Sequence, residues 1–152
     1  MTETTQGFDL KVSRLIPATP EEVFDAYTDP EQQKIWFNIL EETPMILEIE
    51  ADLRVGGEMR NVWGYTEDEL FRETNVIRVL DRPHRLVTTS SGSSPDGQSM
   101  TTELEITFEE AEGGTLMTVV QTGIPTAEMR DFFADMAWNG AFDRIAAYLA
   151  RR

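Results

Sequence analysis

The chain has 152 residues, enough to bury a core as one domain, and it has no cysteine, which excludes disulfides and thiol chemistry. Its 28 acidic and 13 basic residues give a net charge of −15, and a field of this sign repels both nucleic acid and anionic membranes. The sequence has no apolar run of about 18 residues and no signal peptide, so we expect one cytoplasmic domain over residues 1–152, with residues 1–7 disordered.

The first predicted elements are a strand and two short helices. Residues 10–16 have the apolar pattern of a strand, which Pro17 ends. Thr19, Pro20 and Glu22 form a helix-start signal, because Thr can cap the helix, Pro suits its first position and Glu can return a hydrogen bond to the cap. The same signal recurs at residues 29–32, so we predict a second helix directly after the first.

The rest of the chain predicts strands followed by one long helix. We expect strands at residues 45–49, 59–63, 70–80, 85–89, 101–108 and 115–123, turns at 56–57, 81–84 and 112–114, and a Ser/Gly-rich loop at 90–97. A final helix begins at Pro125-Thr126 and runs to about Ala150. This order predicts an α+β domain in which a curved antiparallel sheet closes over a helix around an apolar interior.

The final helix carries two apolar stripes that helical spacing places roughly opposite each other. One stripe consists of Trp138, Phe142, Ile145 and Leu149, and the other of Met129, Phe132, Phe133 and Met136. Either the helix kinks near Gly140 and turns both stripes inward, or it is continuous and the second stripe contacts another surface. In the second case Ala127 and Ala134 leave room inside, and a homodimer forms through Met129, Phe132, Phe133 and Met136.

Five segments, in this order, resemble a known family: residues 18–24 (ATPEEVF) with 28–30 and Trp36, residues 52–60 (DLRVGGEMR), residues 83–87 (PHRLV), residues 114–121 (GTLMTVVQ), and Trp138 with 142–145 (FDRI) and 148–149. The chain resembles bacterial proteins related to the C-terminal domain of the activator of heat-shock protein ninety ATPase, in the SRPBCC (START/Bet v 1-like) superfamily. The resemblance implies a helix-grip fold, in which about six or seven strands wrap around the C-terminal helix. It also implies a cavity between sheet and helix that binds apolar or amphipathic small molecules.

Candidate ligand-binding residues follow from the strand faces and from this resemblance. If the faces of Asn61 and Gln121 point inward, each amide is a buried polar group whose partner is either a ligand or another core side chain. The resemblance places Trp36 and Trp63 at the mouth and wall of the cavity, although core packing also explains both. The expected ligand-binding residues are Trp36, Met59, Asn61, Trp63, Met117, Val119, Gln121, Ala134 and Trp138.

No pattern indicates an activated catalytic residue, a metal site or a cofactor. His84 is the only histidine and falls in a predicted turn, where a general base would lack a pocket and an orienting partner. The sequence has no G-x-S-x-G element and no Asp-rich metal loop. Gly56-Gly57 lacks the residues of a phosphate loop, so we expect a turn there. Arg54 is expected either to anchor this turn or to pair with a surface carboxylate.

Three functions stay open. The first is a small-molecule-binding protein with little or no catalysis, in which Asn61, Gln121 or an indole N–H orients the ligand. The second is an enzyme of the polyketide-cyclase or dehydratase kind in the same cavity, which needs an inward acid or phenol from Tyr65, Glu73 or Glu103. The third is a chaperone-associated interaction module that uses the outer Met/Phe stripe of the last helix.

Overall fold

The structure, a computed structural model, describes residues 7–151. The expected disorder of residues 1–7 therefore concerns, apart from Gly7, residues outside the described range. In chain order the elements are β1 (Phe8–Ile16), α1 (Pro20–Thr28), α2 (Pro30–Trp36), β2 (Ile46–Ala51), β3 (Glu58–Gly64), β4 (Phe71–Asp81), β5 (Arg85–Ser93), β6 (Ser99–Ala111), β7 (Gly114–Ile124), α3 (Ala127–Phe132), η1 (Phe133–Trp138) and α4 (Asn139–Ala150).

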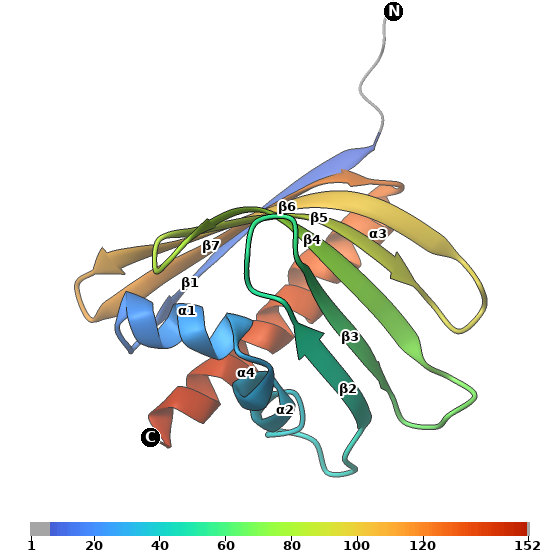
Figure 1. The fold of residues 1–152 in the computed structure, drawn as a ribbon, viewed down its shortest axis with the longest axis horizontal. Coiled ribbons are helices and arrows are strands. Elements are labelled where there is room, and N and C mark those ends of the chain that lie inside the picture. The colour runs from blue at the N-terminus through green and yellow to red at the C-terminus, as the bar shows by residue number, and fades with distance from the viewer. Residues whose placement is uncertain (1–6, 152) are drawn as a thin grey trace, which may run out of the picture.

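The strands form one curved antiparallel sheet that wraps over the C-terminal helix. The seven strands lie in the order β1-β7-β6-β5-β4-β3-β2, so the sheet is a meander in which only the first strand is displaced, to pair with the last. Figure 1 shows α3 and α4 crossing the inner, concave face of the sheet, with α1 and α2 at one end. The predicted α+β helix-grip fold is confirmed. In the part of the chain that the structure describes, no helix is long and apolar enough to span a membrane.

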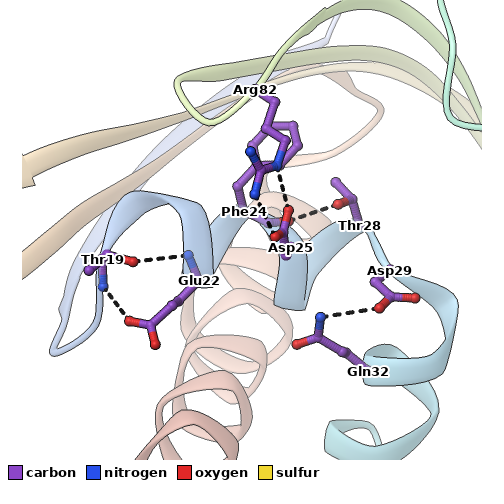
Figure 2. A network of polar contacts seen from close by, with 8 residues as sticks. All are labelled: Thr19, Glu22, Phe24, Asp25, Thr28, Asp29, Gln32 and Arg82. Atoms are coloured by element: carbon purple, nitrogen blue, oxygen red, sulfur yellow. Dashed lines mark hydrogen bonds and ion pairs between the residues drawn. The ribbon is translucent and has the colours of Figure 1, made fainter.

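The two short helices start where the sequence predicts. Thr19 Oγ1 accepts a hydrogen bond from the Glu22 backbone N–H (3.2 Å), and the Thr19 N–H donates to Glu22 Oε1 (2.9 Å), which completes a capping box. Asp29 ends α1 and caps α2 by accepting from the Glu31 backbone N–H (3.1 Å), and Gln32 Nε2 also donates to the Asp29 carboxylate (3.1 Å). Figure 2 shows the α1 capping box and the Gln32–Asp29 contact. A single residue at the junction thus stops one helix and starts the next.

An arginine connects the sheet to the first helix. Arg82, in the turn between β4 and β5, donates from Nε and Nη2 to the two carboxylate oxygens of Asp25 on α1, at 2.8 and 2.7 Å (Figure 2). This two-pronged geometry fixes orientation as well as distance, because the planar guanidinium matches the carboxylate. It holds α1 against the β4–β5 end of the sheet.

Two predicted strand boundaries are wrong. Met45 lies outside β2, because the Asn38 side chain bonds both its backbone N–H (2.8 Å) and its backbone C=O (3.2 Å). Residues 90–93 belong to β5 and not to a loop, because they pair with β4 on one side and with β6 on the other. Tertiary pairing therefore overrides the turn propensity of this Ser/Gly-rich segment.

The C-terminal helix is continuous through Gly140. Residues 127–150 stay helical throughout, and a π-helical segment, η1, covers Phe133–Trp138 between α3 and α4. A π turn contains one residue more than an α turn, so it rotates the residues on either side of it relative to each other. Met129 and Phe133 consequently pack against the same core as Trp138 and Phe142, whereas Phe132 and Met136 stay exposed.

Candidate functional site

Polar side chains form a row across the middle of the concave face. Asn61 on β3 lies opposite Glu73 on β4, Asn75 opposite Ser90 on β5, and Ser90 opposite Thr102 on β6. Residues directly opposite each other in a sheet project from the same face, so the register alone aligns these side chains. We call this set the polar row: Asn61, Glu73, Asn75, Thr88, Ser90, Thr102 and Gln121.

The two asparagines direct their N–H groups at one oxygen of Glu73. Asn75 Nδ2 donates to Glu73 Oε1 at 3.1 Å, and Asn61 Nδ2 donates to the same oxygen at 3.4 Å. Thr88 Oγ1 donates to Asn75 Oδ1 at 3.2 Å, which fixes the Asn75 amide with its N–H groups toward the carboxyl. The carboxyl of Glu73 is therefore oriented by three strands.

Burial raises the pKa of Glu73 above its ordinary value, even though hydrogen bonds from Asn75, Asn61 and Ser90 act in the opposite direction. Burial, together with the nearby Glu73 carboxyl, also raises the pKa of Tyr27, which reaches this region from α1. Burial thus shifts the pKa of both groups upward, toward their uncharged forms. The phenol and the carboxyl meet on the concave face of the sheet.

The side chains of Gln121 and Trp138 are hydrogen-bond partners. The Trp138 indole Nε1 donates to Gln121 Oε1 at 3.0 Å, and Gln121 Nε2 donates to Thr102 Oγ1, also at 3.0 Å. Trp138 further stacks on Tyr27, with ring centroids 6.3 Å apart and an interplanar angle of 28°. Of the two interpretations of Gln121, the satisfied core amide is therefore the one that the structure supports.

Asn61 differs from Gln121 because half of its amide is unpaired. The residue is 8% exposed, and its Oδ1 has no hydrogen-bond partner among the described residues. An unpaired buried acceptor costs about 1–3 kcal/mol relative to a paired one. The same amide donates through Nδ2 to the Glu73 carboxyl, and the next pair on this face of β3 and β4 is Trp63 opposite Phe71, whose rings stack at 5.6 Å.

Several predicted ligand-binding residues are instead packed in the core. Trp36 is buried, and its indole Nε1 donates to the Ala26 carbonyl at 2.7 Å, so it closes the α1–α2 junction and does not form a mouth. Met59, Met117 and Val119 belong to the same continuous hydrophobic core. By contrast Trp63, Ala134 and Trp138 are only partly buried, although Ala134 and Trp138 also pack against this core.

The two best-defined hollows both lie outside the space between sheet and helix. The larger, about 430 Å³, lies at the β2–β3 turn around Asp52 and Arg54, and the smaller, about 260 Å³, lies on the outer face beside Arg72 and Thr74. A void lined by Trp63, Met117 and Trp138 is therefore not among them. The concave site is a buried polar row, in which only Glu73 is partly exposed, with aromatic neighbours.

Of the three candidate acids and phenols for catalysis, only Glu73 faces inward. Tyr65 is exposed and donates to Glu41, which also accepts from Arg144 on α4 at 2.7 Å. Glu103 is exposed on the outer face and accepts from Thr89 at 3.1 Å. The sequence interpretation missed Tyr27, which supplies an inward phenol from α1.

The remaining predicted features lie at the surface. His84 is exposed in the turn before β5, and Arg54 pairs with Asp52 at 2.8 Å beside the Gly56-Gly57 turn, both as expected. Over residues 7–151 no cluster of three or more His, Asp or Glu side chains is arranged to hold a metal ion. In the Met/Phe stripe, Phe132 and Met136 are 57% and 64% exposed, while Met129 and Phe133 face the core.

Comparison with solved structures shows the same fold in several proteins. A protein from Rhizobium leguminosarum superposes with a TM-score of 0.80 at 19% identity, with 98% of each chain covered. One from Rhodobacter sphaeroides gives a TM-score of 0.74 at 27% identity, covering 98% of this chain and 97% of that one. DynU16, a protein of the dynemicin biosynthetic locus, gives 0.70 at 20% identity, covering 93% of this chain but 47% of its own.

A comparison with curated proteins finds no match. Residues 17–150 match the sequence profile of the family described as "Activator of Hsp90 ATPase homolog 1-like protein". This match spans α1 to α4, and so includes the capping box, the polar row and the π-helical segment. The family expected from the five sequence segments is therefore confirmed, and the chain belongs to the Activator of Hsp90 ATPase homolog 1-like family, which is of the SRPBCC type.

Proposed function

We propose that this protein binds a small amphipathic molecule between the concave face of the sheet and the C-terminal helix, with the polar group of the ligand at Asn61 and Glu73. The observation that carries the proposal is the unpaired Oδ1 of Asn61, a buried acceptor next to an oriented carboxyl. Buried polar atoms in folded proteins almost always have partners, so a missing one favours a partner from outside the chain.

The surroundings of this oxygen support the same proposal. Trp63, Phe71 and Phe37 form an aromatic group beside it, with Phe37 packed edge-on to Trp63 at 6.5 Å. Aromatic side chains of this kind bury the apolar body of a ligand at about 25 cal/mol per Å². The π-helical segment also faces the polar row through Trp138, and π turns within helices are frequent at functional sites.

Native mass spectrometry of the protein purified from its own host tests the proposal. We expect a retained small molecule that is released on gentle denaturation. The variant Ala134→Phe fills the inner side of η1 and should abolish retention, whereas Thr74→Val, on the outer face of β4, should not. If the parent chain carries nothing and also shows no saturable change in tryptophan fluorescence with amphipathic probes, the binding function is wrong.

The Glu73–Tyr27 pair favours a second candidate, an enzyme that uses acid–base chemistry on its ligand. A general acid must hold its proton near neutral pH, and burial moves the pKa of Glu73 in that direction. Loss of water from a β-hydroxy ketone, followed by NMR, would report this activity. We expect Glu73→Gln to abolish it, and equal rates with and without the protein would contradict this candidate.

A homodimer through the Met/Phe stripe would use only its two exposed residues. Phe132 and Met136 are available for a contact along α3 and η1, since Met129 and Phe133 pack inward. If the protein as purified holds no ligand but forms a stable dimer that Met136→Glu dissociates, the interaction role replaces the binding role. The chaperone association that the family name suggests would then be the next role to test.

A further inference from the structure

Strands β3 to β7 place no positively charged side chain at the polar end of the proposed site. β3 to β7 carry four arginines, Arg60, Arg72, Arg78 and Arg85, and all four lie at exposed positions of the outer face. On the concave face of these strands, within the described residues, there is no lysine, arginine or histidine. An anionic ligand group placed there would be desolvated without a compensating positive charge from these strands.

The hydrogen-bonding groups at this end are one acceptor and one donor. Asn61 Oδ1 is the acceptor, since it has no partner within residues 7–151. Glu73 Oε1 accepts from both asparagines, and the Ser90 hydroxyl is a third neighbour of the carboxyl. Burial favours a proton on this carboxyl, and a protonated carboxyl is a hydrogen-bond donor.

We propose that this end of the site selects an uncharged ligand group that is donor and acceptor at once, a hydroxyl or a carboxamide, held between Asn61 Oδ1 and the Glu73 carboxyl. The inference rests on the proposed binding function and names the chemical class of the ligand. A hydroxyl donates to Asn61 and accepts from Glu73 through one oxygen, and a carboxamide does so through its N–H and C=O. A carboxylate offers no donor, and an ammonium offers no acceptor.

Four probes that share the same alkyl chain and differ only in the head group separate head-group selection from binding itself: 1-decanol, decanamide, decanoate and decylamine. Each is titrated at pH 7 by tryptophan fluorescence and by calorimetry. We expect decanol and decanamide to bind at least about tenfold more tightly than the two charged probes, because each charged group leaves a buried charge or polar group unmatched. Equal affinity for all four would overturn the head-group proposal and leave the binding function intact. No binding of any probe would contradict the binding function.

Variants assign the selection to the two side chains. Asn61→Leu removes the acceptor at similar volume, and we expect decanol and decanamide to lose about fivefold to tenfold in affinity, the effect of one hydrogen bond. Glu73→Gln keeps a neutral donor, so both should bind within about threefold of the parent. Thr74→Val, on the outer face, is the matched control and should change nothing. Tightest binding of decylamine, abolished by Glu73→Gln, would show an ionised Glu73 and overturn the proposal.

Discussion

The indole nitrogen of Trp138 donates a 3.0 Å hydrogen bond to Gln121 Oε1 and so connects the π-helical segment to the centre of the sheet. Gln121 in turn donates to Thr102, so the contact continues across β7 to β6. The π turn is what directs Trp138 at this amide while Phe133, at the other end of η1, also faces the core. The helix path and the polar row therefore depend on each other.

Trp138→Phe should destabilise the fold, because it leaves a buried amide oxygen of Gln121 without a donor. We expect a loss of about 1–3 kcal/mol in the free energy of unfolding, measured by urea denaturation. Gln121→Leu should cost a similar amount. The double variant should lose less than the sum by at least about 0.5 kcal/mol, because the two residues are partners. Strict additivity would mean that the hydrogen bond contributes nothing.

Glu73→Gln should change how stability depends on pH. Burial raises the folded pKa of Glu73 above its ordinary value of 4.5, so between these two values the folded state binds more protons than the unfolded state. The stability that the neutral carboxyl contributes is complete below the unfolded pKa and is lost as pH rises through the folded pKa. The melting temperature of Glu73→Gln minus that of the parent should therefore increase from pH 4 to pH 8.

Glu110→Gln serves as the control for that experiment, because Glu110 is exposed on β6 and the substitution changes the net charge by the same amount. If the two variants follow the same pH profile, the difference comes from the overall charge of the acidic protein and not from the buried position of Glu73.

The turn between β2 and β3 should tolerate Gly56→Ala better than Gly57→Ala. Gly56 has φ +87° with no atom in the way of a Cβ, so alanine there meets only the left-handed backbone cost of about 1–2 kcal/mol. A Cβ on Gly57 would lie 2.1 Å from the Asp52 carbonyl oxygen, and backbone must move. We expect a loss of about 3 kcal/mol or more by chemical denaturation. Equal effects of the two substitutions would contradict this account.

Thr19→Ala should cost more than the loss of the Arg82–Asp25 ion pair. The substitution removes the side-chain acceptor of the α1 capping box, and we expect about 1 kcal/mol in thermal or urea unfolding. Asp25→Asn breaks a pair whose side chains are 38–53% exposed, so about 0.2–1 kcal/mol is expected, decreasing as salt is added. A salt-independent loss on Asp25→Asn would show that the contact acts through packing.

The sequence alone determined the local elements and their order. Thr19 and Asp29 cap the two short helices as predicted, because a cap is a contact between neighbours in the chain. The last helix begins next to the predicted Pro125-Thr126, with Thr126 as its cap. The alternation within residues 101–108 placed Leu104, Ile106 and Phe108 on the buried face, because strand periodicity needs no knowledge of the partner strand. The resemblance of five segments then identified the family and its fold.

Only the tertiary structure decided which side chains meet. Glu73 was one of three candidates, and strand register places it opposite Asn61 on the concave face. Tyr65 lies past the end of β3, and Glu103 contacts Thr89 on the outer face. The amide oxygen of Gln121 has a donor because the π turn directs Trp138 at it, and local spacing in the sequence does not encode that turn. The amide oxygen of Asn61 has no such partner among the described residues. Contacts between residues far apart in the chain are fixed by strand pairing and by the helix path, and neither can be derived from one segment at a time.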